Sequence, residues 1–274
     1  MEIITNYTIE CFKNHLLEEE KSASTVEKYI RDVRCFENRF HGRKAEKNDV
    51  LEYKRELCEN YAPRSVNSIL SSLNTFFAYI NRHDLRVKTL KIQRQIFADE
   101  QRELSRGEYE RLLSAAKRAK KERLYCLLQA LGSTGLRISE ISSVTVEAVK
   151  ESVATINCKG KIRQVFLSKQ LCRLLLSYAK KYGIKKGAVF VTRNGNPLNR
   201  SNIWTEMKKV AEKAGVALEK AFPHNLRHFF ARTYYNMHKN ISRLADILGH
   251  SSINTTRIYT IESGRQHIAG IERV

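Results

Sequence analysis

The sequence predicts a mainly α-helical protein with a small antiparallel β-sheet, arranged as an N-terminal four-helix bundle followed by an α+β domain. Three observations predict this class. Only 3 Pro and 12 Gly are present and 28% of the residues are charged, which is typical of a helix-rich protein. The length of 274 residues is enough for two domains, each with its own core. Apolar residues recur at three- and four-residue steps through most of the chain. Two β-like runs flank a Lys-Gly turn near residue 160.

Four helices joined by short connections are expected in the first domain, residues 1–85. Ser24 is expected to cap the second of them, because Glu27 follows three residues later and completes a capping box. Pro63 suits the first turn of the fourth. The expected helices cover residues 5–19, 22–36, 49–60 and 64–80.

The fourth helix has a polar face that carries few charges, opposite an apolar stripe. Such side chains can reach base edges or phosphates, although an ordinary solvated face is the alternative. A weakly periodic linker with basic side chains then follows over residues 86–103, where it could lie against a nucleic-acid backbone. The candidate DNA contacts in this half of the chain are Arg64, Asn67, Ser71, Asn74, Arg86 and Lys88.

The second domain begins at Leu104, where Ser105 and Glu108 form another capping box. A β-hairpin is expected over residues 152–167, with the basic Cys158-Lys159-Gly160-Lys161 segment at its tip. Val189–Val191 is a candidate third strand. Further helices are expected over residues 106–117, 122–131, 168–182 and 199–214.

The charge of the chain points to a polyanionic partner. The formal net charge is +20, and it is uneven: residues 1–95 carry +3, whereas residues 96–274 carry +17. No apolar run approaches the roughly 18 residues of a membrane span. No secretory leader is expected, because the first ten residues lack an apolar segment after a basic start.

The most informative stretch is residues 221–260. His224 and Arg227 share a helix face that starts just after Pro223, and Gly249-His250 follows a short helix. Tyr259 lies nine residues after His250. An arginine fork, imidazoles and a phenol together suit phosphate chemistry. Zinc is not expected, because Asn225 stands where the metalloprotease helix motif needs its Glu.

A second cluster lies upstream in Thr134-Gly135-Leu136-Arg137-Ile138-Ser139-Glu140. Arg137 sits between apolar residues, so burying it needs a partner, and Glu140 is three residues away. The motifs T-G-L-R-I-S-E, H-x-L-R-H and L-G-H-S-x-x-x-T-T-x-x-Y, in this order, resemble the tyrosine recombinase family of phage-integrase and Xer-type enzymes.

The resemblance spans nearly the whole chain. It implies that residues 1–85 form a helical, SAM-like core-binding domain and residues 104–260 a catalytic domain, with residues 261–274 as a tail exchanged between subunits. It also implies that Tyr259 attacks the scissile phosphate, that Arg137, Arg227 and His250 hold its oxygens, and that His224 handles the tyrosine proton. Lys159 would protonate the leaving 5′-oxygen, with Lys161 as the alternative, and Glu140 would hold Arg137. No metal or other cofactor is implied.

The resemblance further implies an enzyme that cuts and rejoins double-stranded DNA at paired inverted sites. The chain would be a monomer or dimer when free and a homotetramer in the synaptic complex, helped by an accessory directionality protein, with Lys161 and Arg163 as further DNA contacts. A cytoplasmic, nucleoid-associated protein of a bacterium, phage or mobile element is expected, with no membrane partner. The alternatives are a catalytically silent DNA-binding protein and a type IB topoisomerase-like nicking enzyme.

Overall fold

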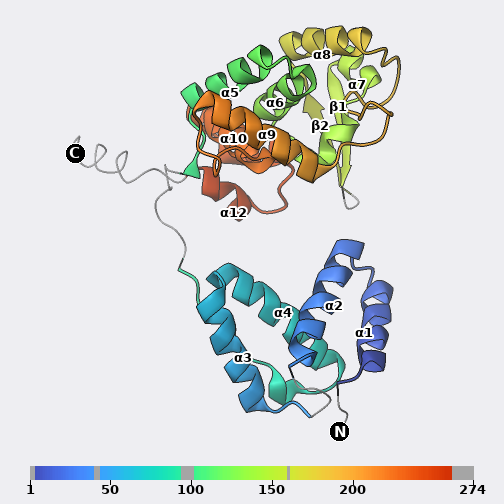
Figure 1. Ribbon diagram of the computed structural model, residues 1–274, viewed down its shortest axis with the longest axis vertical. Helices are drawn as coiled ribbons and strands as arrows, with labels where there is room; N and C mark the ends of the chain where they lie inside the picture. The colour runs from blue at the N-terminus through green and yellow to red at the C-terminus, as the bar shows by residue number, and fades with distance from the viewer. Residues whose placement is uncertain (1–3, 40–43, 94–101, 159–160, 261–274) are drawn as a thin grey trace, which may run out of the picture. The chain divides into compact units, whose positions relative to one another are not determined.

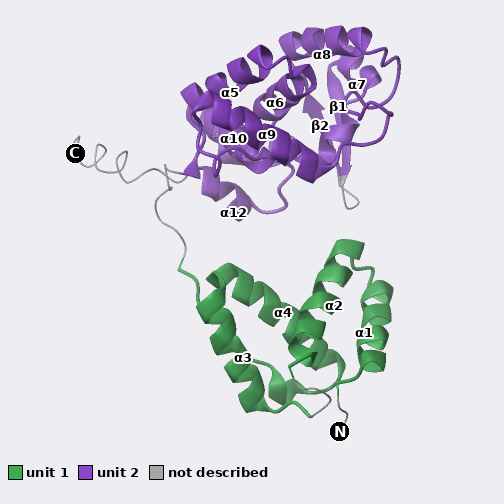
Figure 2. Cartoon of the chain, viewed as in Figure 1, with its two compact units in different colours: residues 1–94 green, residues 95–274 purple. Residues whose placement is uncertain are grey.

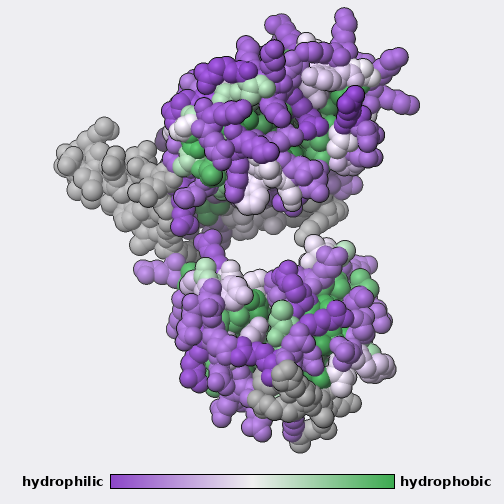
Figure 3. Space-filling view, viewed as in Figure 1, coloured by the Kyte–Doolittle hydropathy of each residue, from purple (hydrophilic) through white to green (hydrophobic). Residues whose placement is uncertain are grey.

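The structure is a computed structural model that describes residues 4–39, 44–93, 102–158 and 161–260. The chain divides into two compact units, residues 1–94 and 95–274 (Figure 2). Each unit has its own apolar core. Figure 3 shows that the visible face of each unit is mostly hydrophilic, as the charge of the chain leads one to expect.

Unit 1 is a four-helix bundle, as predicted (Figure 1). Its core is formed by the apolar stripes of all four helices, and Phe12, Phe36, Phe76 and Phe77 are fully buried there. A short 3-10 helix, η1 (His83–Leu85), follows the bundle. The helices are α1 (Asn6–Glu18), α2 (Ala23–Glu37), α3 (Lys47–Asn60) and α4 (Pro63–Tyr79).

The predicted cap of the second helix is wrong. α2 begins at Ala23, two residues before the start that a Ser24 cap would give, so its N-cap is Ser22, whose backbone is extended. The Ser22 hydroxyl bonds the Thr25 hydroxyl at 2.8 Å instead of capping a backbone N–H. By contrast, α3 has a capping box between Glu46 and Asp49 that was not predicted.

Unit 2 packs most of its helices against one another, and a small two-stranded antiparallel sheet lies at one side of them (Figure 1). The strands are β1 (Val153–Cys158) and β2 (Lys161–Phe166), with Ile156 opposite Arg163 in the register. Ser105 and Glu108 form the predicted capping box of α5. The helices are α5 (Arg106–Arg118), α6 (Glu122–Thr134), α7 (Val146–Glu151), α8 (Lys169–Lys181), α9 (Arg200–Ala214), α10 (Pro223–His238), α11 (Ile241–Leu248) and α12 (Ile253–Thr256), with the 3-10 turns η3 (Ile138–Ser143) and η4 (Arg257–Tyr259).

The expected third strand is absent from the part of the chain that the structure describes. Around Val189–Val191 there are only two isolated bridges, Thr145 to Ala188 and Val191 to Pro197. Val189 and Phe190 are nevertheless buried, so this segment serves the core without joining the sheet. No helix within the described ranges is long and apolar enough to cross a bilayer.

Candidate active site

Arg227 stands at the centre of the candidate site and is almost fully buried. It lies in the first half of α10, which starts at Pro223, and the residue is 1% exposed. Its Nη1 donates to the Gly135 carbonyl at 2.6 Å, and its Nη2 donates to the Leu248 carbonyl at 2.7 Å. These carbonyls end α6 and α11, so the partial negative charge of two helix C-termini stabilises the guanidinium.

Gly135 makes this arrangement possible. It ends α6 in the left-handed conformation, with φ of 67°. A Cβ atom at this position would lie 2.4 Å from the ring of Phe230. Only glycine therefore allows the chain to turn here and still present its carbonyl to Arg227.

His250 is held between Arg227 and Thr256. Its Nε2 lies 2.9 Å from Arg227 Nη2, and its Nδ1 lies 2.9 Å from the Thr256 hydroxyl. A guanidinium can only donate, so Nε2 accepts and the neutral ring carries its hydrogen on Nδ1. Burial, followed by the positive charges of Arg227 and Arg137, lowers the pKa of His250 to about 4, which keeps the free imidazole neutral.

Tyr259 lies against these groups in the same chain. It belongs to η4, is 3% exposed, and packs with Leu244 and Leu248. Its ring meets the His228 ring edge-on with centroids 4.9 Å apart, and it stacks on the His250 ring at 6.1 Å.

Arg137 and Glu140 form the predicted pair. Arg137 precedes η3 as its N-cap, and its Nη1 donates to Glu140 Oε1 at 2.8 Å. Its backbone N–H donates to Glu140 Oε2 at 2.8 Å. Burial would raise the pKa of the Glu140 carboxyl, but hydrogen bonds from Arg163 and from Arg137 outweigh it and lower that pKa to about 2.

Positive charge is concentrated in this cluster. Burial, then the charge of Arg137, lowers the pKa of Arg227 to about 10, which leaves the guanidinium charged at neutral pH. Burial, then His224 and Arg227, lowers the pKa of His228 to about 4. Partial desolvation, then Arg227 and Arg137, also lowers the pKa of His224, although its side chain remains exposed. Such a site favours an anion, which would relieve the repulsion.

Comparison with known proteins identifies the kind of site. Residues 102–264 match the phage integrase family, and residues 9–84 match the N-terminal SAM-like domain of phage integrase. The chain belongs to the phage integrase family. It is a tyrosine recombinase, of the class that cleaves and rejoins DNA through a tyrosine intermediate.

The relatives cover almost all of the recombinase. Tyrosine recombinase XerA of Thermococcus kodakarensis is 30% identical over 266 residues, which are 93% of this chain and 90% of that protein. The structure of XerH site-specific recombinase bound to difH substrate matches with a TM-score of 0.72 at 18% identity, over 98% and 84% of the two chains. A lambda integrase (75–356) dimer bound to a COC' core site matches with a TM-score of 0.77 at 14% identity, over 95% and 96%. The two structures share the fold.

The structure brings together most of the predicted site residues of the recombinase. Arg227, His250 and Tyr259 contact one another directly or through the neighbouring ring of His228. Arg137 and His224 are close enough to affect the pKa values of this group. Lys159 lies outside the described residues, and Lys161 is placed only as the first residue of β2.

Two predicted DNA contacts have a different role in the structure. The amide of Asn67 bonds the Leu90 backbone in both directions, at 2.9 and 2.7 Å. The amide of Asn74 does the same with Val87, at 2.9 Å each way. Both side chains therefore hold the segment after η1 against α4. As a result, residues 86–93 belong to unit 1 rather than to a separate linker, which corrects the predicted boundary at residue 85.

The remaining DNA-contact candidates of unit 1 are accessible. Arg64 and Ser71 are exposed on α4, and Arg86 and Lys88 are exposed on the segment that follows η1. Arg163, predicted as a DNA contact, instead points inward: its side chain is 14% exposed and it pairs with Glu140 at 2.8 Å. The alternation along β2 explains this, because the neighbours Ile162 and Phe166 are the exposed residues.

Three residues at the site were not assigned to it from the sequence. His228 was visible in the H-x-L-R-H motif, four residues after His224 on the same helix face, and its ring lies 4.7 Å from that of His224. Thr256 is part of the Thr-Thr pair before the tyrosine, yet its bond to His250 depends on how α12 folds back. The pairing of Arg163 with Glu140 leaves no signal in the sequence, because the two residues are 23 positions apart, on β2 and η3.

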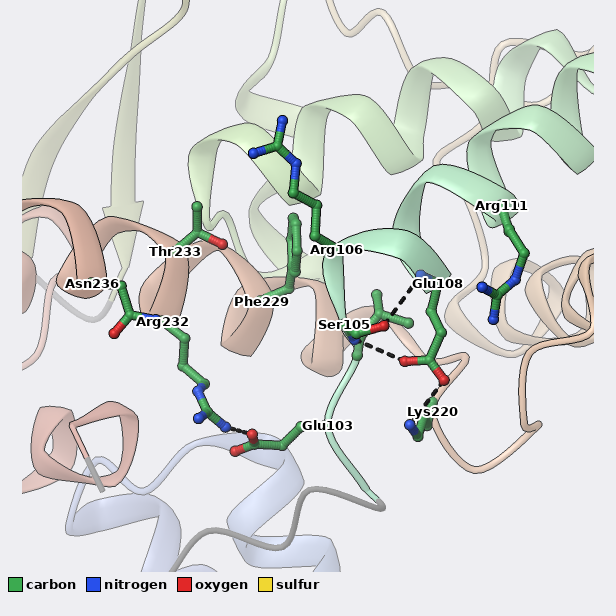
Figure 4. Close-up of a pocket in the computed structure, with 11 residues that line it drawn as sticks. Glu103, Ser105, Arg106, Glu108, Arg111, Lys220, Phe229, Arg232, Thr233 and Asn236 are labelled. Carbon is green, nitrogen blue, oxygen red and sulfur yellow. Dashed lines mark hydrogen bonds and ion pairs between the residues drawn. The ribbon is translucent and has the colours of Figure 1, made fainter. Parts of the chain in front are cut away.

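A cavity of about 590 Å³ lies on another face of α10 (Figure 4). Phe229, Arg232 and Asn236 line it at helical spacing, away from the face that bears Arg227. Its charged walls are paired internally, since Arg232 meets Glu103 and Lys220 donates to Glu108 at 2.9 Å. Among the described residues, no three His, Cys, Asp or Glu side chains are grouped so as to hold a metal ion.

Proposed function

We propose that this recombinase cleaves and rejoins duplex DNA at a specific site, with Tyr259 as the nucleophile of a 3′-phosphotyrosyl intermediate. The observation that carries the proposal is the contact of the Tyr259 ring with two imidazoles beside the buried Arg227, all within one chain. A phenol with an ordinary pKa near ~10 is a weak nucleophile, and cationic neighbours favour its phenolate.

Each other group has a role in that reaction. Arg137 and Arg227 would bind the non-bridging phosphate oxygens. His250 would donate to them through Nε2 once a phosphate oxygen has replaced its contact with Arg227 and the ring has taken up a proton at Nε2, which the negative charge of the phosphate favours. His224 would take the tyrosine proton, which its lowered pKa favours because the ring is then neutral. Each preorganised donor is worth roughly 3–4 kcal/mol of transition-state stabilisation.

The step is balanced without an external reactant. The Tyr259 oxygen forms a bond to phosphorus while the bond from phosphorus to the 5′-oxygen breaks. Lys159, with Lys161 as the alternative, would give a proton to that leaving oxygen. The phosphotyrosyl ester keeps the energy of the original bond, so the free 5′-hydroxyl of the exchanged strand can reverse the reaction and release Tyr259.

DNA would be held by both units. Unit 2 carries most of the excess positive charge, so affinity should fall steeply as salt concentration rises. The exposed Arg64, Ser71, Arg86 and Lys88 would contribute contacts from unit 1. We further propose paired inverted sites, a homotetramer on two duplexes, exchange of residues 261–274 between subunits, an accessory directionality protein and a cytoplasmic location near the nucleoid.

A covalent-trapping assay tests the proposal. Wild type and Tyr259→Phe would be incubated with nicked duplexes that carry candidate sites from DNA flanking the gene, without added metal. A denaturing gel should show a protein–DNA adduct with wild type only. Specific binding without an adduct on any strand position would favour a catalytically silent DNA-binding protein, and adducts on unrelated sequences would favour a topoisomerase-like nicking enzyme.

A further inference from the structure

The Glu140 carboxylate is shared between two arginines. Its Oε1 accepts from Arg137 Nη1 at 2.8 Å and from Arg163 Nη1 at 3.0 Å. Its Oε2 accepts from the Arg137 backbone N–H at 2.8 Å and from Arg163 Nη2 at 2.8 Å. The Glu140 side chain is only 4% exposed. One buried anion is thus bonded by two cations, and the group has a net charge of +1.

Arg163 is built into the site rather than lying on its surface. It comes from the inward face of β2, and its Nε is buried without a partner among the described residues. Its stem lies directly on Gly249: a Cβ atom there would be 2.7 Å from Arg163 Cδ. The charge of Arg163 also contributes to the lowered pKa of His250. The side chain therefore joins the hairpin to η3 and to the turn that carries His250.

The two arginines bond the carboxylate differently. Arg163 uses both terminal nitrogens, in the bidentate geometry that is strongest for an arginine–carboxylate pair. Arg137 uses one guanidinium nitrogen in the bonds of the described residues, and 36% of its side chain remains exposed. If Arg163 were removed, the guanidinium of Arg137 would be the cationic partner left for the buried Glu140 carboxylate. That carboxylate would then largely neutralise the charge that Arg137 offers to a phosphate.

We propose that Arg163 is a positioning residue for DNA cleavage: it binds the Glu140 carboxylate so that Glu140 orients Arg137 without cancelling its charge toward the scissile phosphate. This inference rests on the proposed function. Arg163 does not contact DNA in this role, and its contribution passes through Glu140. Removing the Glu140 carboxylate as well should then restore part of the cleavage rate that is lost when Arg163 is removed.

The test is a single-turnover measurement of adduct formation on the nicked duplex that wild type cleaves, with protein saturating the DNA. Arg163→Met keeps the stem and removes the charge, and it should slow cleavage roughly 10- to 100-fold with little change in DNA affinity. Arg163→Lys keeps the charge and should retain more activity than Arg163→Met. The double variant Glu140→Gln/Arg163→Met should be faster than Arg163→Met alone, by roughly 10-fold.

A matched control is Arg123→Met, which breaks a half-buried pair with Glu206 (2.9 Å) between α6 and α9 in the same unit. It should cleave at the wild-type rate. All rates are measured at a temperature below the thermal unfolding midpoint of every variant, so that loss of folded protein does not lower the measured rate.

Two results would overturn the inference while wild type still forms its adduct. One is a double variant that is as slow as Arg163→Met or slower, because the carboxylate of Glu140 would then not be what slows cleavage in Arg163→Met. The other is an equal cleavage rate of Arg163→Lys and Arg163→Met, which would show that the positive charge at position 163 does not affect cleavage. Absence of an adduct with wild type on every substrate would instead overturn the proposed function itself.

Discussion

Acid should destabilise unit 2 through two partly buried imidazoles, those of His228 and His250. The pKa of each is lowered from 6.5 to about 4, mainly by burial. Both rings regain their ordinary pKa in the unfolded chain. As the pH falls below 6.5, the unfolded state therefore binds protons that the folded state does not, and stability is lost until the folded rings titrate near pH 4.

The size of this effect follows from the two pKa values. At pH 5 each ring should lower the unfolding free energy by about 2 kcal/mol relative to pH 8, so that the two rings together lower it by about 4 kcal/mol. Glu140 contributes little in this window, because its pKa is lowered from 4.5 to about 2 and its contribution is lost only in more acidic solution. The lowered pKa of His224 acts in the same direction as the two rings.

The protein offers a local probe for this measurement. Its one tryptophan, Trp204, lies on α9, so urea unfolding followed by its fluorescence reports on unit 2. His250→Gln should reduce the difference between pH 8 and pH 5 by about half. His238→Gln, at the exposed end of α10, is the control and should leave the difference unchanged. Equal wild-type stability at the two pH values, or equal behaviour of the two variants, would refute this reasoning.

Three further predictions concern single substitutions. Arg137→Lys should lower single-turnover cleavage by about 10²-fold or more at nearly unchanged DNA affinity, since a lysine cannot bind two oxygens; near-normal cleavage would remove Arg137 from the site. Gly135→Ala, at φ of 67° and with a Cβ 2.4 Å from Phe230, should lower the unfolding free energy of unit 2 by about 2 kcal/mol or more. An unchanged urea midpoint would contradict that prediction. Thr256→Val removes the acceptor 2.9 Å from His250 Nδ1 and should cost about 1–3 kcal/mol in stability and slow cleavage. Wild-type stability and cleavage in this variant would show that the bond does not hold the imidazole.

Local features of the chain were well predicted from the sequence. The capping box of Ser105 and Glu108 and the hairpin around Gly160 depend on residues close in the chain, and both are found. The Arg137–Glu140 pair is of the same kind, because a buried arginine needs an anion and the nearest one is three residues away. Where two nearby serines could cap one helix, as at Ser22 and Ser24, the local pattern did not discriminate between them.

Features that depend on distant segments were missed. The polar face of α4 has the composition of a DNA-reading surface, yet Asn67 and Asn74 are used by backbone that arrives later in the chain. Arg163 has a basic neighbour at a hairpin tip, which favours a DNA contact, but the register of β2 turns it toward Glu140. Neither the backbone bonds of the two asparagines nor the pairing of Arg163 could be predicted from the sequence, because both depend on which distant segments of the chain pack together.

The way in which Arg227 is held affects how the site can change over generations. Besides its bond to His250, it donates to the carbonyls of Gly135 and Leu248, which belong to the peptide backbone. A side-chain partner can be removed by one codon change, whereas the Leu248 carbonyl remains whichever residue stands there, and the Gly135 carbonyl is displaced only by a residue that disturbs the turn. The central guanidinium therefore has two partners that mutation alters only by moving the ends of α6 or α11. Arg137, by contrast, depends on a replaceable carboxylate, so sequence drift should alter its surroundings first.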